Sequence, residues 1–262
     1  MGGSTVLVGW GLAVALVLLL LIAASTALAL HLGLSRQVVV AAVRAVVQLT
    51  AVSSVIVVVA RSLWLSALFV LVMFTVASWT SARRVAAAGG ASATWLPIAA
   101  GVVPVLAVVL GCRAVPLTGI AVVPIAGIII GGAMTATSLA GRRALDELDT
   151  RHGEYEAGLS LGLLERDAAL EICRPAATQA LVPPLDQTRT VGLVTLPGAF
   201  VGVLIGSGSP VQAGAAQLLV LIGLLAAEVI AVLVTVELVA TGRLGRRPAR
   251  PSARRWGRRA LR

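Results

Sequence analysis

Long apolar stretches alternate with short polar ones along this chain. A helix needs about 20 apolar residues to cross a hydrocarbon core ~30 Å thick, and its backbone must bond internally because lipid offers no hydrogen bonds. The pattern therefore predicts an all-α polytopic membrane protein with about seven spans, near residues 6–30, 38–60, 63–80, 95–111, 119–140, 191–206 and 212–240. The composition agrees, since 58% of the 262 residues are hydrophobic and 12% are charged.

The first apolar stretch has to be weighed against a signal peptide. No basic residue precedes it, and at about 25 residues it is longer than the apolar region of such a peptide. The tripeptide Ala27-Leu28-Ala29 does resemble a cleavage site. A retained span is the preferred interpretation, and cleavage is the alternative.

The charged residues orient the predicted spans. Nine of the eleven acidic residues lie in one loop, Gly141–Arg189, and nine of the 21 basic residues lie in the last twenty positions. A cytoplasmic tail makes that loop cytoplasmic too and leaves only Arg61 and Arg113 on the far side, as the positive-inside rule requires. We therefore expect the N-terminus outside and the C-terminus inside. The expected organisation is one transmembrane domain (1–262) containing a cytoplasmic loop (141–190) and a basic cytoplasmic tail (242–262).

The excess of basic residues bears on partners. A basic tail beside a final span favours attraction to anionic lipid over nucleic-acid binding. All the basic residues are Arg, and the chain has no Lys. Because a phosphate-binding P-loop requires its Lys, ATP hydrolysis of that type has to reside on a separate subunit.

Motifs for enzymatic chemistry are missing from the sequence. Cys112 and Cys173 belong to no Cys/His cluster and fall on opposite sides of the membrane in this orientation. There is no HExxH and no Ser–His arrangement, and His31 and His152 lie outside the predicted spans. The sequence favours a non-enzyme and shows no metal-ligand set.

Several polar, Gly and Pro residues inside the spans are candidates for a transport path. A buried amide or carboxyl either bonds a neighbouring helix or lines the path. The Gly- and Pro-containing fifth span either packs closely or borders a cavity. In the sixth span, Gly198, Gly202 and Gly206 form one smooth face beyond a kink at Pro197. The predicted path residues are Gln48, Pro124, Gly131, Gly132, Met134, Thr195, Pro197, Gly198 and Glu228.

The long loop carries a recognisable spacing. Glu156-Ala157 is followed by Gly162, then after nine residues by Ile172, with Pro175 three residues further on. This resembles the coupling loop of ABC importer permeases, with the pattern EAA, three residues, Gly, nine residues, Ile-x-Leu-Pro. Two positions depart from that pattern, Gly158 in place of Ala and Arg174 in place of Leu.

The loop is expected to dock on a motor subunit. Gly162 can adopt the positive φ of a sharp turn between two short helices. Apolar residues after the turn are predicted to enter a groove of the partner, with Glu165, Arg166 and Asp167 at its rim. The predicted coupling residues are Glu156, Ala157, Gly162, Leu163, Leu164 and Ala168. The alternative is an ordinary amphipathic loop.

A longer set of residues covers essentially the whole chain: Arg44, Gln48-Leu49, Pro124, Gly131–Met134, Leu159–Gly162, Pro183, Asp186, Arg189–Gly198, Pro210, Ala213 and Gln217. It resembles the Fet-type iron-export permease family, which also includes plant aluminium-tolerance half-transporters. The segment TVGLVTLPG, Thr190–Gly198, is the most specific part of the resemblance.

The resemblance implies the permease subunit of an ABC exporter, in a bacterial inner (plasma) membrane. Such a chain is expected as one of two permease copies, driven by a separate ATP-binding cassette ATPase that holds ATP-Mg, with no cofactor of its own. Iron is the first expected substrate. The family usually has Gly-Asn at Gly131-Gly132 and Pro-Gly-Met-Met at Pro197–Phe200, so potential metal contacts are lost here. The alternatives are a nucleotide-sugar-like substrate and proton-driven secondary transport through Glu228.

Overall fold

A computed structural model describes residues 9–31, 33–85 and 93–244 of the chain. The regular secondary structure of these residues is helical throughout, which confirms the predicted all-α class. The greater part of the predicted basic tail, residues 245–262, lies outside the described residues.

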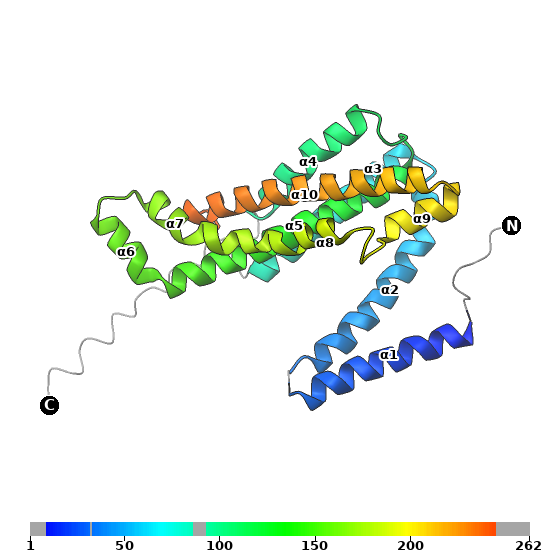
Figure 1. Ribbon diagram of the computed structural model, residues 1–262, viewed down its shortest axis with the longest axis horizontal. Helices are drawn as coiled ribbons and strands as arrows, with labels where there is room; N and C mark the ends of the chain where they lie inside the picture. The colour runs from blue at the N-terminus through cyan, green and yellow to red at the C-terminus, as the bar shows by residue number, and fades with distance from the viewer. Residues whose placement is uncertain (1–8, 32, 86–92, 245–262) are drawn as a thin grey trace. The chain divides into compact units, whose positions relative to one another are not determined.

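The chain divides into two compact units, with the boundary between Val59 and Ala60. The first unit is a hairpin of two apolar helices, α1 (Trp10–Ala29) and α2 (Ser35–Val59), which pack side by side (Figure 1). The connection between them includes Gly33 at φ +66°, a conformation that favours glycine.

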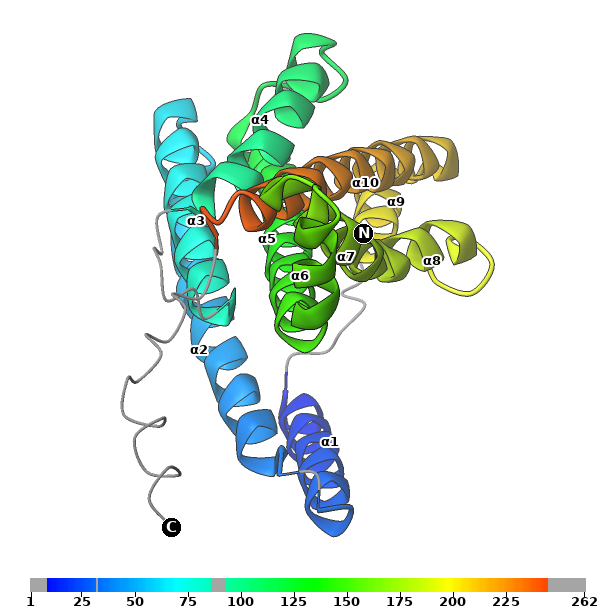
Figure 2. The same ribbon diagram turned by 90° about the vertical axis from the view of Figure 1, so that its left-hand side faces the viewer.

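The second unit contains the remaining helices. Their bounds are α3 (Leu63–Val85), α4 (Trp95–Gly111), α5 (Gly119–Thr150), α6 (His152–Ser160), α7 (Glu165–Thr178), the 3₁₀ turn η1 (Gln179–Leu181), α8 (Val182–Thr190), α9 (Gly198–Ser207) and α10 (Pro210–Ala240). The two longest, α5 and α10, pack together at the centre, with α3 against α5 and α4 against α10 (Figure 2).

Small residues allow these helices to approach closely. A Cβ on Gly101 of α4 would overlap the backbone of Ala227 in α10, and one on Gly127 of α5 would lie 2.7 Å from Met73 Cε in α3. At the far end of α5, a Cβ on Gly141 would lie 3.2 Å from a methyl of Val85. Close approach through small residues is how helices associate in lipid, where neighbouring tails are as apolar as the side chains.

Five of the predicted spans are helices long and apolar enough to cross a bilayer: α1, α2, α3, α5 and α10. The other two are shorter apolar helices, α4 with 17 residues and α9 with 10. Ten residues rise about 15 Å, half the thickness of the hydrocarbon core. The sixth predicted span, expected over residues 191–206 with a kink at Pro197, contains a shorter helix than predicted, because residues 191–197 are irregular and α9 begins only at Gly198.

The fifth span departs from expectation in the opposite direction. Its Gly and Pro content predicted a weak, interrupted helix, yet α5 runs unbroken through 32 residues, with Pro124 inside it. Tertiary packing accounts for the difference, since α3, α4, α7 and α10 all lie against α5 and outweigh its low helix propensity.

The segment between α6 and α10 returns along the central pair. Cys173 Sγ in α7 lies 3.7 Å from the Ala144 carbonyl oxygen, and Arg143 donates to Gln179 Oε1 at 3.0 Å. Residue numbers therefore increase along α7 as they decrease along the facing part of α5. Figure 1 shows α7, α8 and α9 following one another from the end near α6 to the end where α10 begins.

Candidate functional site

The coupling loop folds as an elbow of two helices. We use "elbow" for α6, the turn at residues 161–164 and α7. Gly162 takes φ +89° at the turn, as predicted. Two leucines at the turn are highly exposed, Leu161 at 86% and Leu164 at 71%. Large apolar side chains so exposed outside the apolar spans offer a contact surface for another protein.

One predicted docking residue does not face outward. Ala168 is buried, and a Cβ added to Gly158 would lie 3.3 Å from the Ala168 Cβ. Ala168 therefore packs α7 against α6, and its predicted place in a partner's groove is wrong for this conformation. The same contact explains Gly158, since the close approach of the two helices leaves little room for the Ala of the related pattern.

The elbow is fastened to the end of α10 by a bidentate ion pair. Arg166 donates from Nε to Glu237 Oε1 at 2.5 Å and from Nη2 to Glu237 Oε2 at 3.0 Å. The hydrogen bond that Arg166 donates to Glu237 raises the pKa of the Arg166 guanidinium. The two residues lie 71 positions apart in the sequence, and no local pattern indicates that they pair.

The interior of the elbow is continuous with the core. Cys173 of α7 is fully buried, and desolvation raises the pKa of its thiol to about 11. Ala169, Leu170, Cys173 and Ala177 share one apolar cluster with residues of α5 and with Val232 and Val236 of α10. Both cysteines are free, as predicted, and Cys112 is exposed.

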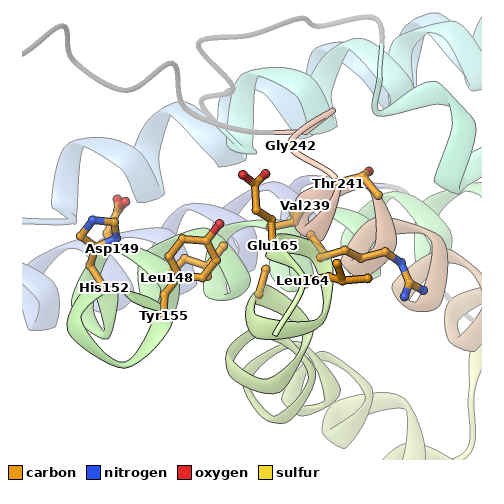
Figure 3. A pocket seen from close by; sticks show the side chains of 12 residues that line it. Leu148, Asp149, His152, Tyr155, Leu164, Glu165, Val239, Thr241 and Gly242 are labelled. Atoms are coloured by element: carbon orange, nitrogen blue, oxygen red, sulfur yellow. The ribbon is translucent and has the colours of Figure 1, made fainter. Parts of the chain in front are cut away.

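An open pocket of about 660 Å³ lies where the elbow meets the ends of α5 and α10. Figure 3 shows Asp149, His152 and Tyr155 on one side of it and Leu164 and Glu165 on the other. Burial, and then the nearby charge of Glu165, raise the pKa of Tyr155. Across residues 9–31, 33–85 and 93–244, no three His, Cys, Asp or Glu side chains are grouped so as to hold a metal ion.

Two of the predicted path residues meet between the central helices. Glu228 of α10 is buried, and a Cβ on Gly132 of α5 would lie 2.7 Å from Glu228 Oε1 and overlap Leu224 Cδ1. The other carboxyl oxygen, Oε2, has no hydrogen-bond partner among the described residues. Gly132 thus provides the room for an ionisable group that the bilayer interior makes costly.

The TVGLVTLPG segment contains the break before α9. Pro197 precedes the first turn of α9, and Gly192 takes φ +82°. Phe200 N donates to Oε1 of the buried Gln217 in α10 at 3.1 Å, which fixes the start of α9 against that helix. Gln217 was not predicted as a site residue, although a lone amide in an apolar span is a signal for such a bond.

The remaining predicted path residues are dispersed. Gln48 lies on α2 in the first unit. Pro124 and Gly202 line an apolar cavity of about 690 Å³, and Met134 packs beside the core. Gly131, Gly198, Gly202 and Gly206 have no atom within 4 Å of an added Cβ. Close packing in α5 thus occurs at Gly132 instead of Gly131, and within the described part of the second unit no helix packs closely on the glycine face of α9.

Long apolar helices with a polar helical elbow at one end define a multi-spanning helical membrane protein. The chain belongs to the uncharacterised protein family UPF0014, whose model matches residues 10–242. It is 31% identical over 203 residues to the UPF0014 membrane protein STAR2 of Oryza sativa subsp. japonica, covering 76% of this chain and 71% of the relative.

Two further relatives carry functional names. The chain is 33% identical over 152 residues to Protein ALUMINUM SENSITIVE 3 of Arabidopsis thaliana, covering 58% of this chain and 56% of that one. It is 31% identical over 159 residues to the probable iron export permease protein FetB of Escherichia coli, covering 60% and 61%. No solved structure matches the chain. The family comparison supports a membrane permease and agrees with the resemblance seen in the sequence.

Proposed function

We propose that this chain is the permease subunit of an ABC exporter, working as one of two copies with separate ATP-hydrolysing subunits. The observation that carries the proposal is the elbow, with Leu161 and Leu164 exposed at its turn and Arg166 joining it to Glu237. The membrane is the inner (plasma) membrane of a bacterium, with the N-terminus outside and the elbow in the cytoplasm. Seven crossings require α4 and the α8–α9 segment to cross in addition to the five long helices.

Movement passes from the elbow to the spans along two connections. A partner that engages Leu161 and Leu164 displaces α7, and the Arg166–Glu237 pair transmits that displacement to α10. The buried contact of Cys173 with the Ala144 carbonyl transmits it to α5. A close-packed interior moves as a body instead of deforming continuously, so closure of the ATPase pair shifts α5 and α10 together.

A metal ion, iron first, is the proposed substrate. The support is the printed name of the E. coli relative as a probable iron export permease. Glu228 and Gly132 are the proposed path residues in the second unit, because a buried carboxyl at this depth is the strongest cation ligand that the central helices present.

Proton-driven transport through Glu228 is the second candidate. It is favoured by the unpaired Oε2 atom, which a proton or a cation would satisfy. Glu228→Gln separates the two mechanisms. ATP-driven export retains its dependence on ATP in this variant, whereas proton-driven transport loses its response to a pH gradient.

The partner is tested by co-purification. Leu164→Asp places a charge on the exposed turn without opening a cavity, and Leu117→Asp makes the same change at an exposed position near the start of α5. We expect a P-loop ATPase to co-purify with the wild type and with Leu117→Asp, and to be lost with Leu164→Asp. Equal recovery with all three chains contradicts docking at the elbow.

A further inference from the structure

Where the bilayer should lie, the chain forms the polar helix α8 (Val182–Thr190) and then the irregular segment 191–197. A pocket between it and α10 is lined by Val191, Gly192, Leu196 and Pro197 on one side and by Gly214, Gln217, Leu218 and Leu221 on the other. Residues 214–221 lie about 6–17 Å from the first residue of α10 at 1.5 Å per residue. The irregular segment 191–197 is therefore level with the apolar part of a span.

Along the membrane normal, helix α8 lies between residues 191–197 and the cytoplasmic end of the central helices. The preceding Gln179 is hydrogen-bonded to Arg143 in the polar part of α5. From there α8 extends back along the central helices to residue 191. It carries Asp186 and Arg189, paired at 3.5 Å, with exposed fractions of 59% and 73%. An exposed ion pair on a helix at this depth is incompatible with lipid hydrocarbon.

The backbone of residues 191–197 is also unsuited to contact with lipid. The N–H groups of Gly192, Leu193 and Val194 bond to Thr195 or Thr190 carbonyls within the turn. The carbonyls of Val191, Gly192, Leu193 and Val194 accept no hydrogen bond from the described residues. Irregular backbone inside a membrane is tolerated only where protein covers it or where it lines an aqueous cavity.

We propose that this surface, α8 with the turn at residues 191–197, is the contact between two copies of the chain, which enclose the polar path between them. The inference rests on the proposed function of a permease that works as a pair. A copy of the same chain supplies complementary charge. Two α8 helices related by a two-fold axis along the membrane normal place each Asp186 diagonally opposite Arg189 of the second copy, one turn away.

Cross-linking through a single cysteine tests the contact. Cys112→Ser removes the exposed thiol and leaves Cys173, which is buried with a pKa raised to about 11 and so is unreactive. Leu193→Cys in this background places a thiol at a position 90% exposed on the turn, and Ile222→Cys places one on the exposed α4 side of α10. One reactive cysteine per chain yields a covalent product only with a second molecule.

In native membranes under mild oxidation, we expect Leu193→Cys to form a homodimer at least about tenfold faster than Ile222→Cys, since a shared interface raises the effective thiol concentration. Equal rates, or a cross-link to a different protein, overturn the proposal. If the first unit of the same chain covers this surface instead of a second copy, Leu193→Cys forms no cross-linked dimer, and the proposal is overturned. If ATPase co-purification persists in the same samples, the proposed function stands and only this interface fails.

Mixed charge reversal provides a second test. Asp186→Arg and Arg189→Asp each create like charges across the contact, so each variant expressed alone should lose pairing between differently tagged copies by about tenfold. Co-expression of the two variants restores opposite charges between copies and should restore pairing. The double variant Asp186→Arg/Arg189→Asp in one chain controls for folding. No recovery in the mixture overturns the proposed contact.

Discussion

At the scale of single residues, the junction of α5 and α10 depends on one glycine. Gly132 lies against Leu224 and Glu228, whereas its neighbour Gly131 has no atom within 4 Å of an added Cβ. The sequence pointed to both glycines equally. Only the packing of α10 separates them, because successive Cβ atoms point in different directions around a helix and only the one at Gly132 would point toward α10.

Adjacent glycine substitutions should therefore have opposite effects on stability. Gly132→Ala forces the Leu224 and Glu228 side chains apart and should destabilise the protein by about 1–3 kcal/mol. Gly131→Ala gains helix propensity and should be neutral or stabilising by up to ~1 kcal/mol. Thermal unfolding of the two variants in the same detergent measures the difference. Similar melting temperatures would show that the contact is not close.

At the scale of elements, the long spans follow from apolar length, and Pro197 indicates a kink before α9, but the irregular stretch over residues 191–197 does not follow from the pattern. Residues 191–206 contain no charged side chain and are mostly apolar, like α10, so hydropathy alone predicts a span that begins at residue 191. The physical reason for the break lies in Gly192, which adopts φ +82°, and in Pro197, which cannot donate to the helix ladder. The elbow was predictable because the positive φ at Gly162 has a recognisable sequence context.

The contact between the elbow and α10 yields a prediction about coupling. Arg166→Ala removes the bidentate pair between Arg166 and Glu237, whose side chains are both nearly half exposed, so the stability of the protein should change little. ATPase binding should persist in this variant. Transport per ATP hydrolysed should fall severalfold, because a displacement of α7 is no longer transmitted to α10.

A matched control is available at Arg151, between α5 and α6. Arg151→Ala removes exposed ion pairs with Glu147 of α5 and Glu154 of α6. Neither pair involves α10, so the variant should leave the coupling ratio unchanged. The reversal Arg166→Glu/Glu237→Arg should restore part of the ratio. The ratio of transport to hydrolysis in reconstituted vesicles decides the matter, and a normal ratio in Arg166→Ala argues against this connection.

At the scale of the whole molecule, the orientation rests on basic residues and not on packing. The two cysteines allow it to be measured, since Cys112 is exposed and Cys173 is buried. In intact cells, a membrane-impermeant maleimide should label Cys112 from outside and should not label Cys173. Gly153→Cys in α6, where an added side chain meets no atom within 4 Å, should be labelled only after the membrane is opened. The reverse labelling pattern would show that the predicted topology is inverted.

The central claim is that ATP hydrolysis on a separate subunit drives this permease through the elbow. Inside-out vesicles containing the chain and its co-purified ATPase test it most directly, with iron(II) outside and ATP-Mg supplied. The account predicts iron accumulation that requires ATP, is unaffected by dissipating the proton gradient, and is lost in Leu164→Asp but kept in Leu117→Asp. Accumulation that is independent of ATP and abolished by dissipating the proton gradient would contradict it.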